Sequence, residues 1–381
     1  AGTRRAILKT GGAALLIAGT GAAGWALTRA PRTARAPWDA AAKGFGDPRL
    51  DALAYAILAP NPHNMQPWRV RLEGEDAFWL YADLSRMLPE TDPQNRQIAI
   101  GFGAFLELFR QAAAEKGLRA GIIPFPEGEP APTLDARPIA HVRLVANASV
   151  ARDPLFGYAL TRRTNRNAFE AREVAPEILD VLKAATVPGV FADVAVDPVR
   201  LAEIKELAKQ AWRTEWTLDR TRRESIKVTR LGKKEIDEQP FGLALAGPLL
   251  EGLSVAGLLT REKMDTPGAS AYEQAVSAYV DAIEASPAFL FATTATSSRR
   301  DQLDAGAAFV RMHLAATKEG LACQPVSQAL QEFPEMGDHY RRAHALLASG
   351  GGVVQMLARI GYAKAGVPPA PREALEAQLI S

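Results

Sequence analysis

The sequence predicts an α+β protein in which two similar halves follow one another in a single chain. Each half is expected to run through a helix, a loop, a strand and a long helix that ends at a Lys/Gly turn. The two long helices end in the similar strings AEKGL (114–118) and ATKEGL (316–321). With 381 residues, 48% of them hydrophobic, the chain can bury one large core or two fused smaller ones.

The first half is predicted from its apolar spacing and its turn residues. Apolar residues at helical spacing predict a buried helix that has Pro93 in its first turn and stops at Gly117. The sequence around Gly74 predicts a hairpin. The elements expected in this half are a helix at 48–58, strands at 68–72, 77–81 and 139–145, and a Pro-rich loop at 123–136.

The second half repeats this order and carries an insertion at about 199–268. Within the insertion, a highly charged helix is expected to end at Leu231, and the Gly-, Leu- and Pro-rich stretch 232–268 shows no core periodicity. A lid, a partner surface and a membrane contact remain open interpretations of this insertion. The other elements expected here are a helix at 175–186 and strands at 191–196 and 354–362. We therefore divide the chain into residues 1–36, a first half at 37–155 and a second half at 156–381.

The charges are unevenly placed along the chain. Six basic residues and no acidic residue lie within residues 1–36, so the net charge of +2 for the whole chain becomes −4 for residues 37–381. Binding of nucleic acid needs a clustered basic footprint. A slightly acidic body therefore argues against a nucleic-acid partner.

The first residues have the layout of an export signal. Arg4 and Arg5 are followed by an apolar pair and a lysine, and an uncharged run of mostly Ala, Gly and Leu extends from residue 10 to residue 28. This order closely resembles a bacterial twin-arginine signal. The resemblance implies export of the folded protein across the inner membrane to the periplasm.

Removal of this signal and its retention both remain open. Ala34–Ala36 has the small-x-small pattern of a cleavage site, but Pro37 removes the backbone N–H at the cut. Ala40–Ala42 is a second option, with Lys43 as the new N-terminus. Alternatively, the run of 19 residues, about 28 Å at ~1.5 Å per residue, is kept as a membrane anchor.

Export in the folded state suits proteins that acquire a tightly held cofactor first. The single cysteine, Cys323, excludes an intramolecular disulfide and cysteine-cluster metal sites. The five histidines lack metal-ligand spacing, so no metal site is predicted. The chain also lacks a nucleophile elbow and a G-x-G-x-x-G that follows a strand. An organic cofactor is therefore expected.

The segment 59–68, APNPHNMQPW, joins the first helix to the first strand. The amides of Asn64 and Gln66 each offer a donor and an acceptor, which suits a flavin ring and its ribityl hydroxyls. A rigid turn with satisfied amides is the alternative. The segment resembles the flavin loop of the nitroreductase family, which implies that Asn61, His63, Asn64 and Gln66 contact an FMN cofactor.

A basic segment, RRTNRNAF, opens the second half at 162–169. It resembles the Arg-x-Ser-x-Arg/Lys pattern of the same family, with Thr in place of Ser. The resemblance implies that Arg162, Arg163, Thr164 and Arg166 bind the FMN phosphate. Guanidiniums and a hydroxyl suit this nearly dianionic group. A solvated basic surface is the alternative.

Two later segments extend the resemblance. The segment GLACQPVSQ after the second long helix is similar to the family loop that faces flavin N5, which implies contacts from Pro325, Val326 and a backbone N–H near Ser327. No side chain is expected to act as a catalyst. The tail resembles the family segment that returns to the phosphate, with Arg372 as its basic residue. Arg359 either serves the flavin ring or pairs with a carboxylate.

The resemblance covers about 45–381 and is weakest across 199–298. It implies a nitroreductase-like fold, internally duplicated, with an inserted lid-like segment. Because each half carries only one of the two main flavin motifs, it also implies a monomeric pseudo-dimer with one FMN per chain, as in the Acg-like branch of the family.

The implied function is an FMN-dependent oxidoreductase that passes electrons or hydride to a small acceptor such as a quinone or a nitroaromatic. Nicotinamide dinucleotides are not expected outside the cytoplasm, so a membrane quinol or a partner reductase is the expected donor. Two alternatives remain. One is an FMN-sequestering or accessory protein whose insertion covers the flavin, and the other is a subunit that the retained signal anchors in a membrane complex.

Overall fold

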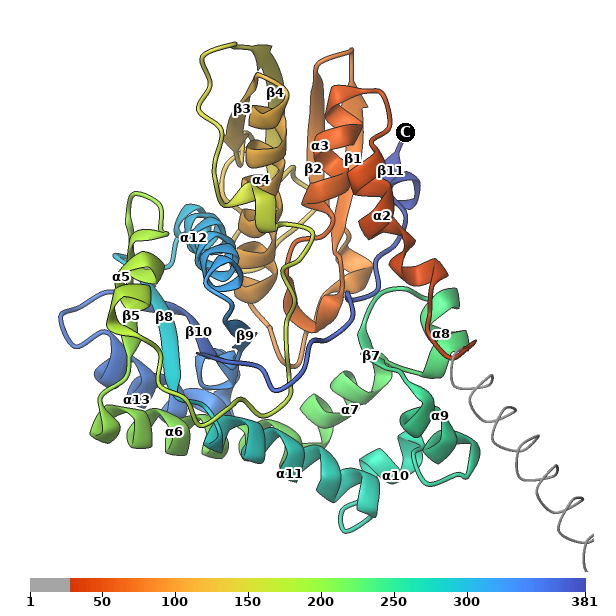
Figure 1. The fold of residues 1–381 in the computed structure, drawn as a ribbon, viewed down its shortest axis with the longest axis vertical. Helices are drawn as coiled ribbons and strands as arrows, with labels where there is room; N and C mark the ends of the chain where they lie inside the picture. Colours follow the sequence, from red (N-terminus) through yellow and green to blue (C-terminus); the bar gives the residue numbers. More distant parts are fainter. Residues whose placement is uncertain (1–27) are drawn as a thin grey trace, which may run out of the picture.

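A computed structural model describes residues 28–381, which form two large β-sheets and a two-stranded sheet (β6-β7), with helices between and around them (Figure 1). Helices and sheets are both present, so the predicted α+β class is confirmed. The twin-arginine prediction falls on residues 1–27 and lies outside the described residues.

The first sheet has the strand order β11-β1-β2-β4-β3. All neighbours in it are antiparallel except β11, which runs parallel to β1. Its strands are β1 (Trp68–Glu73), β2 (Ala77–Ala82), β3 (Leu118–Pro124), β4 (Ala140–Ala146) and β11 (Leu379–Ile380). The hairpin predicted around Gly74 is confirmed as β1 and β2, and the strand predicted at 139–145 is confirmed as β4. The loop predicted from residue 123 starts later, because Ile123 and Pro124 pair with β4.

The second sheet has the order β5-β8-β10-β9, which repeats the order β1-β2-β4-β3, and all its neighbours are antiparallel. Its strands are β5 (Val190–Ala195), β8 (Ala288–Thr294), β9 (Ala322–Pro325) and β10 (Val353–Gly361). In each half the four strands, numbered along the chain, therefore lie side by side in the order first, second, fourth, third. The predicted internal duplication is confirmed by this shared order.

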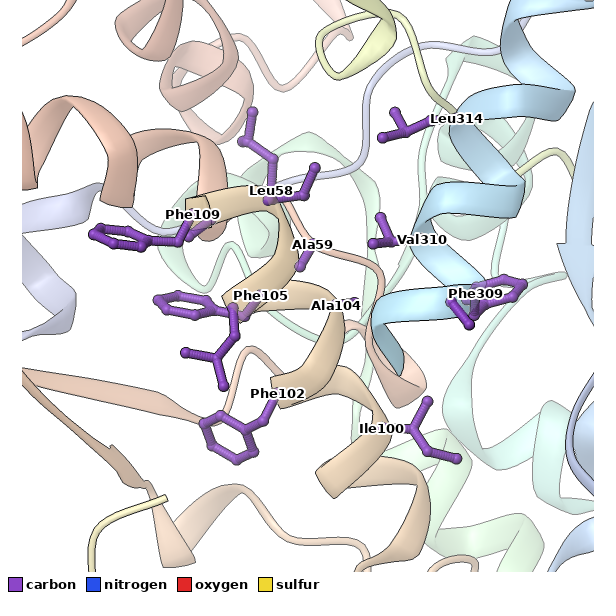
Figure 2. Packing of buried hydrophobic residues seen from close by; sticks show 14 of the residues in the cluster. Leu58, Ala59, Ile100, Phe102, Ala104, Phe105, Phe109, Phe309, Val310 and Leu314 are labelled. Carbon is purple, nitrogen blue, oxygen red and sulfur yellow. The ribbon is translucent and has the colours of Figure 1, made fainter. Parts of the chain in front are cut away.

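Two long helices, α4 (Arg96–Glu115) and α12 (Arg299–Lys318), occupy equivalent places in the two halves and cross at the centre of the molecule (Figures 1 and 2). Their backbones touch at two glycines. A Cβ on Gly306 would lie 1.8 Å from the carbonyl oxygen of Ile100, and a Cβ on Gly103 would lie 1.9 Å from that of Leu303. The crossing therefore requires glycine at both positions, and it joins the two halves into one core.

The beginning of α4 differs from the prediction. Pro93 does not lie in its first turn, because the helix begins at Arg96. The carboxylate of Asp92 accepts hydrogen bonds from the backbone N–H groups of Gln97 (3.1 Å) and Ile98 (2.9 Å). Asp92 therefore satisfies the first turn of the helix from outside and leaves Pro93 in the preceding turn.

Shorter helices complete the two halves around this core. Those outside the insertion are η1 (Thr33–Arg35), α2 (Ala36–Lys43), α3 (Pro48–Ala56), η2 (Pro62–Asn64), η3 (Leu84–Arg86), η4 (Phe156–Tyr158), α5 (Pro176–Ala184), η5 (Ser327–Leu330), η6 (Pro334–Met336), α13 (Gly337–Leu347) and η7 (Leu375–Gln378).

The insertion lies between β5 and β8. Its elements are α6 (Pro198–Thr217), α7 (Asp219–Lys227), β6 (Thr229–Leu231), α8 (Gly232–Glu238), β7 (Leu243–Leu245), α9 (Pro248–Val255), α10 (Arg261–Asp265) and α11 (Ser270–Glu284). The prediction of one charged helix that ends at Leu231 is wrong, because the chain is extended at Leu218. The guanidinium of Arg222 donates to the carbonyls of Trp216 (3.2 Å) and Thr217 (3.3 Å), which satisfies the end of α6.

The N-terminal helix α2 belongs to the core. Trp38 is 5% exposed, and its indole N–H donates to the carbonyl of Ala370 (2.8 Å). Cleavage after Ala42 would remove this tryptophan from the folded protein. In the part of the chain from residue 28 onward, no helix is long and apolar enough to span a membrane.

Candidate functional site

The loop between α3 and β1 has a strained backbone. Five non-glycine residues in the described part of the chain have a positive φ, and three of them lie here: His63 (46°), Asn64 (56°) and Gln66 (50°). Residues with side chains rarely adopt this conformation, and it persists only where the surroundings fix it. Such strain concentrates at functional sites, so the predicted flavin loop is a candidate site on backbone evidence as well.

The amides of this loop are largely used by the protein itself. The side-chain oxygen of Asn61 accepts from the N–H of Gln66 (2.8 Å), and its amide donates to the carbonyl of Ala59 (3.0 Å). Gln66 is fully buried. Its amide donates to the carbonyl of Pro240 (2.8 Å) and accepts from the N–H of Glu373 (2.9 Å). Gln66 therefore acts as a structural link between the loop, the insertion and the tail.

Three of the predicted segments meet at the carbonyls that follow α3. The carbonyl of Leu58 accepts from Arg162 Nη2 (2.9 Å) and from Arg372 Nη2 (3.0 Å). Arg372 also donates to the carbonyl of Ala59 (3.0 Å) and to the side-chain oxygen of Asn64. Leu58 and Ala59 lie beside the crossing of α4 and α12 (Figure 2). The loop, the basic segment and the tail therefore converge at one point.

Arg162, Arg163 and Arg372 form a cationic cluster, and none of them forms an ion pair with a carboxylate of residues 28–381. Burial, followed by repulsion from neighbouring guanidiniums, lowers the pKa of Arg372 to about 9 and that of Arg162 to about 10. Arg163 is half-buried, 4.5 Å from the ring centre of Trp38. Because arginine stays protonated at neutral pH, the lowered pKa values express the free-energy cost of burying these charges together.

Arg166 lies in a different environment. Its side chain is exposed and forms no hydrogen bond or ion pair with residues 28–381, yet burial among protein atoms lowers its pKa. Its charge acts on His63 and Tyr279. Burial, with a further contribution from Arg166, lowers the pKa of His63 to about 4, so that imidazole is neutral at neutral pH.

The loop after β9 lies next to the basic segment. Thr164 and Cys323 form an isolated β-bridge, and β9 ends two residues later at Pro325. The N–H of Val326 donates to a carbonyl of β10 (2.9 Å). The N–H of Ser327 forms no hydrogen bond within the described residues. It stands in the first turn of η5, where a backbone donor has no helical acceptor.

The insertion contacts both predicted flavin loops. Three side-chain hydrogen bonds join them: Tyr279–Gln328 (2.6 Å), Gln331–Glu215 (2.8 Å) and His63–Ser225 (3.1 Å). Burial raises the pKa of Glu215, which lies in α6, to about 7. The insertion is therefore held to the candidate site by polar groups on α6, α7 and α11.

Two arginines with a positioning role differ in how far the sequence indicated them. Arg359 is fully buried, donates to the carbonyls of Asn165 (3.2 Å) and Asn167 (2.8 Å), and lies 3.9 Å from the ring centre of Phe169. It pairs with no described carboxylate and fastens the basic segment to β10. The sequence signal for Arg359 was the position of an arginine within an apolar strand. No sequence signal indicated the role of Arg96, which donates to a carbonyl of η5 (2.6 Å).

The cationic cluster fits a phosphate group. A dianion would remove the repulsion between the guanidiniums, and the Nε of Arg372 is buried without a hydrogen-bond partner. Thr164, in the same segment, adds a hydroxyl. Within residues 28–381, no group of three or more His, Cys, Asp and Glu side chains is placed to hold a metal ion.

No family model matches the chain. Over 335 residues the chain is 28% identical to a protein of Mycobacterium tuberculosis H37Rv provisionally named NAD(P)H nitroreductase Rv3131, and the alignment covers 85% of this chain and 88% of that protein. A second protein of that strain, provisionally named NAD(P)H nitroreductase acg, is 40% identical over 75 residues, which are 20% of this chain and 22% of that protein. Over most of its length the chain is therefore similar to a protein named as a nitroreductase.

Solved nitroreductase structures align with part of the chain. The FMN-dependent nitroreductase NfnB from Mycobacterium smegmatis in complex with NADPH is 19% identical with a TM-score of 0.35, and the alignment covers 57% of this chain and 92% of that one. A nitroreductase with bound FMN from Bacteroides fragilis is 14% identical with a TM-score of 0.33, covering 58% and 95%.

Proposed function

We propose that this chain is an FMN-dependent oxidoreductase of the nitroreductase type. The observation that carries the proposal is the cluster of Arg162, Arg163 and Arg372, which gathers three guanidiniums without an anion where three family-like segments converge. The similarity to a protein named NAD(P)H nitroreductase extends over 85% of the chain and supports the same class of function.

The residues divide into a phosphate side and a ring side in this proposal. Arg162, Arg163, Thr164 and Arg372 would hold the phosphate by charge-assisted hydrogen bonds. The residues proposed to border the ring and ribityl chain are Asn61, His63, Asn64, Arg166, Pro325, Val326 and Ser327. Gln66 stays a proposed contact from the same loop, and its side-chain amide is also buried and bound by Pro240 and Glu373.

The bound flavin would supply a centre that exchanges two electrons with a small acceptor such as a quinone or a nitroaromatic. The contribution of the protein is binding, orientation and exclusion of water. The unpaired N–H of Ser327 is suited to stabilise negative charge on the cofactor. For a periplasmic protein we propose a membrane quinol or a partner reductase as the electron donor, whereas the name of the mycobacterial relative specifies NAD(P)H for that protein.

A flavin-sequestering role is the second candidate function. It is favoured by the hydrogen bonds that hold the insertion to both flavin loops. Steady-state assays with quinone and nitroaromatic acceptors separate the two functions. Turnover with an external donor supports the oxidoreductase, and a flavin that no donor reduces within hours supports sequestration.

We also propose that Arg4 and Arg5 direct folded export to the periplasm, and that the chain acts as a monomeric pseudo-dimer. The export proposal rests on the residues of the N-terminal segment. The monomer proposal is supported by the crossing of α4 and α12, because this crossing already joins two equivalent halves within one chain.

The phosphate assignment is tested by comparing FMN with riboflavin, which lacks the phosphate. Arg163→Ala removes one guanidinium that otherwise donates only to the carbonyls of Leu160 and Arg162. It should weaken FMN binding about ten- to a hundredfold and leave riboflavin binding nearly unchanged. Fluorescence quenching titrations measure both. Equal loss of the two flavins would show that Arg163 supports the fold instead.

Arg166→Ala extends this test to the last arginine of the basic segment. The sequence predicts that Arg166 also contacts the phosphate, in which case its variant loses FMN selectively by a similar factor. A guanidinium that faces the ring would change both flavins equally. Because Arg166 has no hydrogen bond within residues 28–381, the variant should fold. Arg119→Ala, an exposed arginine on β3, is the matched control and should leave both affinities unchanged.

A further inference from the structure

The outer side of the insertion presents several exposed apolar side chains. We define the α9 patch as Pro248, Leu249, Val255, Ala256 and Leu258. Leu249 is 75% exposed, Val255 is 86% exposed and Leu258 is 49% exposed. At 3.6 residues per turn, Leu249, Val255 and Ala256 lie within about a third of the helix circumference. Exposed apolar side chains gathered on one face indicate an interaction surface.

The one charged residue between positions 241 and 259, Glu251, lies one helical turn before Val255, and both residues line a hollow with Lys233, Lys234, Asp237 and Glu238 of α8. Glu251 is 8% exposed and accepts a hydrogen bond from the N–H of Lys233 (2.7 Å). It also forms a salt bridge with Arg29 (3.4 Å). The carboxylate of Glu251 is therefore buried and paired, and charged side chains of α8 border the patch.

The same salt bridge attaches the N-terminal segment to α9. Arg29 directly follows the uncharged run 10–28, which at 19 residues and about 1.5 Å per residue is close to the thickness of a bilayer core. The ion pair Arg29–Glu251 thus joins α9 to the residue that follows this run in the sequence. Lys234 on α8, whose side chain is 85% exposed, pairs with Glu238 (4.0 Å) beside the patch.

We propose that the α9 patch rests on the surface of a lipid bilayer, on the side of the molecule where Arg29 contacts α9. A few apolar side chains on a short helix suit shallow insertion at the headgroup boundary, and a bilayer also accommodates the adjoining run. A second copy of the chain would cover the patch but leave the adjoining run without an apolar environment. The inference rests on the proposed membrane association of the N-terminal segment and is independent of the flavin chemistry.

A label at position 255 tests this contact. The full chain can be labelled at one site, because its one native cysteine, Cys323, is fully buried. Val255→Cys therefore introduces the reactive thiol. The thiol is labelled with an environment-sensitive fluorophore, and the protein is reconstituted with vesicles of phosphatidylcholine and phosphatidylglycerol. We expect a blue shift and quenching by lipids with a nitroxide near the headgroup. Val199→Cys, at a 70% exposed residue of α6, is the control and should report water.

The outcomes separate this inference from membrane association itself. Vesicle-bound protein in which labels at Val255 and Val199 are equally exposed to water would overturn the patch contact but leave the anchor intact. A label at Val255 that is shielded before vesicles are added would also overturn it, because a second copy or the run 10–28 then covers the patch. Failure of the full chain to bind vesicles would overturn both proposals.

A charge substitution gives an independent measure. Leu249→Asp should abolish the blue shift of the label at Val255, and it should weaken vesicle binding about tenfold, since one leucine side chain is no longer transferred from water. Val199→Asp is the matched control and should leave both unchanged. Equal effects of the two substitutions would contradict a specific contact of α9.

Discussion

The buried carboxyl of Glu215 gives a prediction whose magnitude follows from the structure. Burial raises its pKa from 4.5 to about 7, while the hydrogen bond from Gln331 opposes the rise. At a pH between these two pKa values, the carboxyl of Glu215 is protonated in the folded protein and ionised in the unfolded chain. The free energy of unfolding therefore decreases as the pH rises from about 4.5 to about 7, by about 3 kcal/mol in total at about 1.4 kcal/mol per pKa unit.

Glu215→Gln removes this titration and keeps an acceptor for the amide of Gln331. The difference in unfolding free energy between the variant and the parent should move about 2 kcal/mol in favour of the variant between about pH 5.5 and about pH 8. Urea denaturation at the two pH values measures it, and any pH-independent effect of the substitution cancels. Glu203→Gln, at an exposed residue of α6, is the control for charge removal. A difference that does not change with pH would refute the reasoning.

Three further predictions concern the core and the N-terminus. Gly306→Ala should lower the free energy of unfolding by about 3 kcal/mol, because its Cβ meets the α4 backbone. Gly157→Ala is the control, since nothing lies within 4 Å of a Cβ at that position. Similar urea midpoints for the two variants would contradict the close crossing. Replacing Arg4 and Arg5 by lysine should retain the protein in the cytoplasm on cell fractionation, and unchanged export would disprove the signal. N-terminal sequencing of exported protein should find α2 intact, whereas a start at Lys43 would contradict its packing in the core.

The elements that the sequence predicted well are those in which local pattern and burial agree. The hairpin of β1 and β2 follows from apolar strands around Gly74, and α4 follows from its apolar spacing. The break at Leu218 was missed because helical residues continue on both sides of it. It depends on Arg222, which satisfies the carbonyls at the end of α6 from the next helix.

The sequence predicted which segments contribute to the candidate site, but not how their side chains lie relative to one another. The resemblance selected Arg162 and Arg372, yet only the fold shows that both donate to the carbonyl of Leu58. The positive φ of His63 depends on contacts across the loop that no local pattern encodes. The contribution of Glu215 also depends on distant parts of the chain, because α6 comes to lie against η5 only in the folded protein.

Identification of the bound flavin tests the central claim most directly. The protein purified from cells should be yellow, and denaturation should release FMN, which chromatography separates from FAD and riboflavin. One FMN per chain is expected, because we propose a single phosphate site for each chain. That site is the cationic cluster of Arg162, Arg163 and Arg372. A colourless protein that does not take up added FMN would contradict the account.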